Sequence, residues 1–245
     1  MAGHSKWANI KHRKGRVDAK RSKQWSKCSR AIIVAARHGG GDPQYNTTLR
    51  YAIDEAKAAN MPKDTIEKAV KKGTGELDGE TYEEARYEGY GPGGVAILAD
   101  CLIANVNKAA SEIRSVFTKA GGNLGAPGSV GYGFSKQGVI LMDGTANDED
   151  AVMEVALEAG AEDIKNDDGL LQVTTDPASF GGVRDALEAA GHAIEQSEVT
   201  FVPQTLVEMD VNGARKILRL IDALEDNDDV QKVYHNADIP PEAYE

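Results

Sequence analysis

The chain has 245 residues, of which 41% are hydrophobic and 27% are charged, a composition typical of folded domains rather than of disordered chains. No run approaches the roughly 18 consecutive apolar residues of a membrane-spanning helix, and no apolar segment follows the first positive charges as in a secretory signal. Two cysteines, Cys28 and Cys101, are too few for a disulfide framework or a cysteine-built zinc site. They suit a reducing cytoplasm.

The charge distribution is more informative than the net charge of −11. Residues 1–37 hold eleven Lys or Arg residues and one acid, a net charge of +10, whereas the other 208 residues hold 17 basic and 38 acidic side chains, a net charge of −21. A basic segment attached to an acidic body indicates contact with nucleic acid or with a membrane surface. A solvated tail is the simpler alternative.

The basic segment has two parts. Residues 1–16 are polar, contain Gly3 and Gly15, and lack hydrophobic periodicity, so we expect an extended arm. From Val17 to Arg37 the pattern is helical, with Trp25, Cys28, Ile32 and Ala35 on one face and Lys20, Lys23, Lys27 and Arg30 on another. This helix is expected to bury the first face and to present the second.

Two more helices are expected before residue 80. Gly39–Gly41 ends the first helix, and Asp42 is expected to cap a second that begins at Pro43. Pro62 begins a third helix, which Gly73 ends. Residues 74–80 contain Gly75 and Gly79 and form a linker.

After the linker the hydrophobic period becomes two, which predicts strands. In chain order, we expect strands over 82–90 and 95–103, a helix over 111–120, strands over 129–134 and 138–142, a helix over 148–159, strands near 162–165 and 170–174, a helix after Asp176-Pro177, a strand over 194–202, a short segment over 206–209, a helix over 214–224 and a strand over 230–234.

This order predicts an α+β fold with an amino-terminal helical head and two ferredoxin-like α/β sandwich domains, one inserted into the other. Residues 137–202 give the β-α-β-β-α-β order of a complete ferredoxin-like unit. The flanking segments give a second such sandwich, split where its central strands would connect. The expected division is a basic arm at 1–16, a helical domain at 17–80, a discontinuous α/β domain at 81–135 and 204–245, and an inserted ferredoxin-like domain at 136–203.

Two glycine clusters resemble phosphate-binding loops. The segment Gly89–Gly94 matches G-x-G-x-x-G, but a strand follows it where a dinucleotide site needs a helix, so a connection between strands is expected. The segment Gly121–Ser129 could expose backbone N–H groups to a phosphate, but it lacks a lysine, and a turn is favoured.

No catalytic or metal-binding pattern stands out. The five histidines fit no zinc-ligand spacing, Ser129 lacks a nucleophile elbow, and neither cysteine has a histidine nearby in sequence. We therefore expect a non-enzymatic protein without cofactor or metal. An enzyme acting in a cleft between the α/β domains is the less favoured alternative.

Nucleic acid is the partner that the basic segment favours, because lysines and arginines neutralise phosphates and aromatic rings stack on unpaired bases. A membrane would require larger apolar residues opposite the basic face. The two acidic domains would suit a basic protein partner. The predicted nucleic-acid-binding residues are Lys6, Trp7, Lys11, His12, Arg13, Lys14, Arg16, Lys20, Lys23, Lys27 and Arg30.

Several blocks of the sequence resemble the YebC/PmpR family. They are MAGHSKWANIKH at 1–12, GGGDP at 39–43, NMPKDTI at 60–66, YEGYGPGG at 87–94 and GGNLG at 121–125. The resemblance implies three domains and a cytoplasmic bacterial regulator of gene expression that binds DNA. Because mitochondrial relatives activate translation, it also leaves open a ribosome-associated RNA-binding translation factor.

The sequence departs from the family pattern at one place. Members usually carry Asn-Arg-Asn-Arg after the strand over 95–103, where this chain has Asn105-Val106-Asn107-Lys108. If this segment contacts phosphate in relatives, the contact is expected to be weaker here, because lysine lacks the bidentate fork of arginine.

Overall fold

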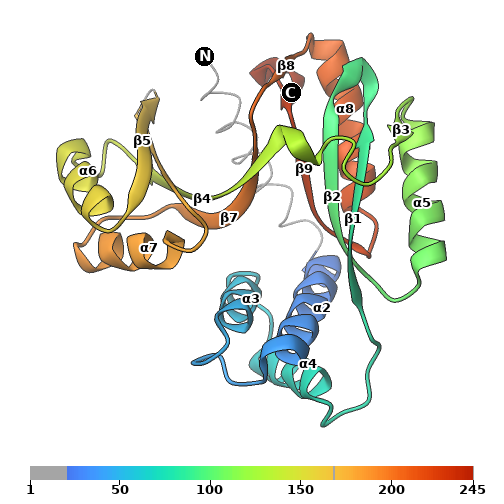
Figure 1. The fold of residues 1–245 in the computed structure, drawn as a ribbon, viewed down its shortest axis with the longest axis horizontal. Coiled ribbons are helices and arrows are strands. Elements are labelled where there is room, and N and C mark those ends of the chain that lie inside the picture. Colours follow the sequence, from blue (N-terminus) through green and yellow to red (C-terminus); the bar gives the residue numbers. More distant parts are fainter. Residues whose placement is uncertain (1–20, 168, 245) are drawn as a thin grey trace. The chain divides into compact units, whose positions relative to one another are not determined.

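The computed structural model describes residues 21–167 and 169–244 (Figure 1). The first described segment is a helical head made of α2 (Arg21–Gly39), α3 (Thr47–Ala58) and α4 (Lys63–Thr74). The predicted apolar face of α2 is confirmed, because Cys28, Ile32 and Ala35 are buried in the core that the three helices share. Trp25 packs against this core, and its indole N–H donates to the Ala59 carbonyl at 2.9 Å.

The predicted beginning of α3 at Asp42-Pro43 is wrong. Asp42 and Pro43 form a turn, and α3 begins at Thr47 with Asn46 as its N-cap. The buried Asn46 side chain accepts from the Leu49 N–H at 3.0 Å and donates to the carbonyls of Ala35 and Gly40, both at 2.8 Å. The Asn46 amide thus hydrogen-bonds to backbone groups at the beginning of α3 and at the end of α2. For this reason Asn46, and not Asp42, is the N-cap of α3.

We expect Asn46→Ala to lower the free energy of unfolding by about 2–3 kcal/mol, because it leaves two carbonyls and one N–H group without their partner. Chemical denaturation monitored by circular dichroism measures the loss. The neighbouring exposed Thr48→Ala is the control and should change stability by about 0.5 kcal/mol or less. Equal effects of the two substitutions would contradict the bracing role of Asn46.

A four-stranded antiparallel sheet of order β3-β1-β2-β9 follows the head. Its members are β1 (Glu83–Tyr90), β2 (Ala96–Ile103), β3 (Asn123–Leu124) and β9 (Val230–His235). The helices α5 (Val106–Lys119) and α8 (Val211–Glu225) share one core with this sheet (Figure 1). Alternate β2 residues Ile97, Ala99 and Cys101 enter that core, as the period of two predicts.

The predicted strand over 129–134 is wrong. A 3-10 helix (Gly131–Gly133) lies in that segment. The strand that pairs with β2 is instead β1, in an antiparallel hairpin that places Tyr90 opposite Ala96. The predicted short segment over 206–209 forms β8 (Val207–Glu208), which pairs in parallel with β10 (Ala237–Asp238) rather than with the four-stranded sheet. A short 3-10 helix (Pro241–Tyr244) follows β10.

The inserted segment forms its own antiparallel sheet of order β5-β6-β4-β7. It contains β4 (Phe134–Asp143), α6 (Glu149–Glu158), β5 (Ala161–Asp167), β6 (Leu170–Thr175), α7 (Phe180–Ala189) and β7 (Gln196–Pro203). When the four strands are numbered 1 to 4 in chain order from β4 to β7, their order in the sheet is 2-3-1-4. This is the ferredoxin-like order. The predicted α+β fold class is confirmed.

The described chain divides into two compact units. Residues 132–206 form the inserted unit, and residues 21–131 together with 207–244 form the other, which contains both the helical head and the first sheet. Among the described residues, no helix is long and apolar enough to cross a membrane.

Candidate nucleic-acid interface

The basic face of α2 lies against the carboxyl-terminal end of α8. The Lys23 ammonium donates to the Asp226 carbonyl at 2.9 Å, and the Lys27 ammonium donates to the Glu225 carbonyl at 2.7 Å. These carbonyls belong to the last residue and the C-cap of α8, where helical carbonyls lack intrahelical partners and the helix dipole is negative. Two lysines one turn apart on α2 therefore neutralise the end of α8.

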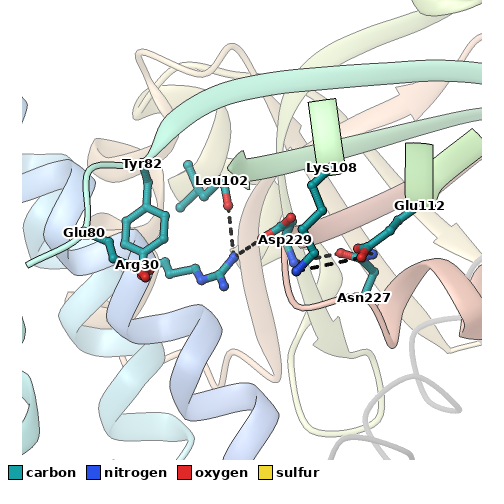
Figure 2. Close-up of polar contacts among 8 residues, drawn as sticks. All are labelled: Arg30, Glu80, Tyr82, Leu102, Lys108, Glu112, Asn227 and Asp229. Atoms are coloured by element: carbon teal, nitrogen blue, oxygen red, sulfur yellow. Dashed lines mark hydrogen bonds and ion pairs between the residues drawn. The ribbon is translucent and has the colours of Figure 1, made fainter. Parts of the chain in front are cut away.

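Arg30, the next residue of the same face, joins the head to the sheet (Figure 2). Its guanidinium donates to the Leu102 carbonyl at 3.1 Å and to the Asp229 carboxylate at 2.5 Å, and it lies 4.9 Å from the centre of the Tyr82 ring. The side chains of Arg30 and Asp229 are only 15% and 16% exposed. Arginine suits this position because its planar guanidinium can donate to a carbonyl and to a carboxylate while it stacks on an aromatic ring.

The sequence-based expectation that this face is presented outward holds for Lys23, which is exposed, whereas Lys27 and Arg30 are partly buried. Lys23, Lys27 and Arg30 all donate hydrogen bonds to residues 102 and 225–229 of the same chain. The other predicted binding residues lie outside the described residues: Lys6, Trp7, Lys11, His12, Arg13, Lys14, Arg16 and Lys20. The described part of α2 therefore has a docking role within the chain.

Replacing Arg30 tests this docking role. We expect Arg30→Ala to lower the free energy of unfolding by about 2–4 kcal/mol, because it leaves the mostly buried Asp229 carboxylate without its cation. Lys63→Ala removes an exposed pair with Glu67, 3.7 Å apart, and should cost less than about 1 kcal/mol. Thermal or chemical denaturation compares the two variants, and an Arg30→Ala protein as stable as Lys63→Ala would contradict the docking role.

A second buried charge organises the loop after α5. Glu88 of β1 is 7% exposed, and its carboxylate accepts from the N–H groups of Gly128, Val130 and Gly131, each at 2.8 Å. Burial by itself raises the pKa of this carboxyl. The three N–H donors lower the pKa by more than burial raises it, so the pKa lies below its ordinary value. The N–H groups of this loop thus bind a carboxylate of the chain itself.

Both glycine clusters therefore have structural roles. Residues 91–95 connect β1 to β2, with Gly93 at φ 76° and Gly94 at φ 77°, in the left-handed region that favours glycine. In the second cluster, a Cβ atom on Gly122 would lie 2.4 Å from the Tyr90 carbonyl oxygen, so only glycine allows this approach. The expected connection between strands is confirmed for the first cluster and the expected turn for the second.

The segment that departs from the family pattern forms the beginning of α5. Asn105 caps the helix by accepting from the Lys108 N–H at 3.1 Å, and Val106 is 51% exposed. The Lys108 ammonium lies 3.8 Å from the Glu112 carboxylate, whose other oxygen accepts from the Asn227 amide (Figure 2). The one cation of this segment is therefore paired within the chain.

The buried thiols are poor nucleophiles. Burial, with a smaller contribution from Glu55, raises the pKa of Cys28 to about 11, and burial together with Asp100 and Asp229 raises the pKa of Cys101 to about 12. Both thiols are therefore protonated at neutral pH. Among the described residues, no group of three or more His, Cys, Asp or Glu side chains could hold a metal ion.

Comparison with known families covers nearly the whole chain. Residues 5–76 match the model of the TACO1/YebC protein N-terminal domain, and residues 82–237 match the model of the TACO1/YebC second and third domain. The chain belongs to the TACO1/YebC family. The resemblance in the sequence blocks is confirmed, and residues 77–81 separate the two matches.

Relatives in this TACO1/YebC family are similar over their full lengths. Proteins named probable transcriptional regulatory protein are 53% identical in Desulforapulum autotrophicum, covering 100% of this chain and 99% of the relative, and 56% identical in Idiomarina loihiensis, covering 99% and 97%. The crystal structure of a conserved hypothetical protein from Aquifex aeolicus superposes with a TM-score of 0.80 at 46% identity, covering 91% of this chain and 93% of the other.

Proposed function

We propose that this TACO1/YebC member is a non-enzymatic, nucleic-acid-binding regulator of gene expression that acts on DNA in the cytoplasm. The observation that carries the proposal is the net charge of +10 over residues 1–37 on a chain whose remainder has a net charge of −21. Relatives named probable transcriptional regulatory protein support DNA as the partner. Phosphate contacts supply the affinity through release of counterions.

Within the basic segment, we assign the nucleic-acid contact to residues 6–20. Because Lys23, Lys27 and Arg30 contact α8, Leu102 and Asp229, phosphates would have to compete for them with existing hydrogen bonds. The assigned cations are Lys6, Lys11, Arg13, Lys14, Arg16 and Lys20, with Trp7 and His12 available to stack on bases.

A ribosome-associated translation factor is the second candidate, and one observation favours it. The inserted unit at 132–206 contains fifteen Asp or Glu residues and three Lys or Arg residues, a net charge of −12. Such a unit is repelled by a long bare duplex but fits beside basic proteins that cover RNA. Under either candidate, we propose three domains: a helical domain at 17–80, a discontinuous α/β domain at 81–135 and 204–245, and an inserted domain at 136–203. We further propose that the two acidic α/β domains bind a basic protein.

Fractionation of cell lysate on a density gradient, at low and at moderate salt, separates the two candidates. For the transcriptional role, we expect the protein to remain at the top of the gradient and to shift promoter-length DNA in a salt-dependent manner. Salt-sensitive migration with ribosomes, without a DNA shift, would replace this role by the translational one. A protein that does neither would contradict both and favour a search for an enzymatic activity.

A further inference from the structure

The segment that connects α2 to α3 carries an exposed aromatic residue, and exposed cations lie in the adjoining turns of both helices. Tyr45 is 86% exposed, which is unusual for a large aromatic side chain in a folded head. Arg37 and His38 in the last turn of α2 are exposed, and so is Arg50 in α3. We call Arg37, His38, Tyr45 and Arg50 the α2–α3 corner.

The corner is held in place by the buried Asn46. Its amide joins Ala35 and Gly40 on one side to Leu49 on the other, so it holds the end of α2, the connection at 40–46 and the beginning of α3 together. Tyr45 directly precedes Asn46, and the Arg50 N–H donates to the Asn46 carbonyl at 2.9 Å. The exposed side chains therefore project from a fixed backbone, which lowers the entropy lost when a ligand binds.

The charge of the corner suits an anionic ligand. Arg37 and His38 stand at the carboxyl-terminal end of α2, where positive charge is also favourable to the helix, and the Arg50 guanidinium lies 5.6 Å from the centre of the Tyr51 ring. The same connection also contains a negative charge, Asp42, whose carboxylate accepts from the Gln44 N–H at 2.9 Å. The contacts of α2 with the end of α8 come from Lys23 and Lys27, in the first half of the helix.

We propose that the α2–α3 corner binds an unpaired nucleotide of a single-stranded nucleic acid, with its base stacked on Tyr45 and its phosphates beside Arg37 and Arg50. Every base offers a flat face to an exposed ring, whereas bases inside a duplex do not. The inference rests on the proposed nucleic-acid binding and adds to it a second contact, outside residues 6–20, that recognises unpaired bases.

A fluorescent base reports this contact directly. The probe is a twelve-nucleotide single strand carrying 2-aminopurine, made as RNA and as DNA, with the corresponding duplex for comparison. The full-length protein should change the 2-aminopurine emission of the single strands and not of the duplex. Tyr45→Ala should abolish this change and weaken single-strand affinity about fivefold or more. Tyr45→Phe should retain both, since it keeps the ring.

Tyr132→Ala is the matched control, because Tyr132 is 77% exposed but belongs to the acidic inserted unit. It should behave as the wild type does. A Tyr45→Ala protein that matches the wild type in 2-aminopurine emission and in affinity would overturn the corner site. The proposed function would still stand if replacement of the cations of residues 6–20 abolished binding. A wild-type protein that binds none of the probes would overturn both.

Discussion

Replacing Glu88 by alanine is expected to lower the free energy of unfolding by about 3–5 kcal/mol, a large effect for a single polar side chain. The carboxylate is buried and accepts three N–H bonds at 2.8 Å from the loop at 128–131. Its removal leaves three backbone donors without a partner, and each such group costs about 1–3 kcal/mol when water cannot reach it. Chemical denaturation of the purified variant measures the loss.

The protonation of Glu88 gives this effect a pH dependence. Because the folded-state pKa is lower than the unfolded value of about 4.5, the ionised carboxylate stabilises the fold at all pH values above the unfolded pKa. This contribution is lost as the pH falls through the folded pKa. Wild-type stability should therefore decline in acid more steeply than that of Glu88→Gln, which keeps the shape but does not titrate.

Glu84→Gln is the control for both measurements. Glu84 lies on the same strand and the same face of β1 but is exposed, so its replacement should change stability by about 0.5 kcal/mol or less. If Glu88→Gln and Glu84→Gln proved equally stable at neutral pH, the loop at 128–131 would not depend on the buried carboxylate.

The largest effect on binding is expected from the amino-terminal cations. Replacing Lys11, Arg13, Lys14 and Arg16 together by alanine should weaken nucleic-acid binding on the order of 100-fold at moderate salt, because four phosphate contacts and their released counterions are lost. The thermal stability should change little, because the substitutions leave the described contacts of Lys23 and Lys27 with the end of α8 intact. Fluorescence anisotropy with labelled DNA and RNA measures the affinity.

Four exposed lysines of α4 provide the matched control, because the same number of positive charges is removed from a helix of the head: Lys63, Lys68, Lys71 and Lys72. Their replacement by alanine should weaken binding only slightly, through the change in net charge. Equal losses in the two variants would show that binding follows overall charge, and the assignment to residues 6–20 would be wrong.

The strand order of the inserted unit could be predicted because its signals are local. Periods of two and of 3.6 alternate over 137–202, and Asp148 caps α6 by accepting from the Ala151 N–H. The beginning of α3 could not be predicted in the same way, since Asp42 and Asn46 are both good capping residues. The choice between them depends on the carbonyls of Ala35 and Gly40, which only the folded head brings to Asn46.

The surroundings of the basic face were beyond sequence reasoning for a related reason. The helical pattern correctly places Lys23, Lys27 and Arg30 on one stripe of α2, but their acceptors lie 203, 198 and 199 residues away in the chain. The same holds for the loop at 128–131, whose N–H groups donate to a carboxylate 40–43 residues earlier in the chain. Charge patterns show which side chains share a face and leave open what that face meets.

Equilibrium binding of the full-length protein to duplex DNA and to structured RNA, over a range of salt concentrations, tests the central proposal most directly. If the six cations of residues 6–20 contact phosphates, the logarithm of the binding constant for duplex DNA should fall with the logarithm of the salt concentration with a slope of about −5. Tight binding that is independent of salt, or no binding to either nucleic acid at low salt, would contradict it.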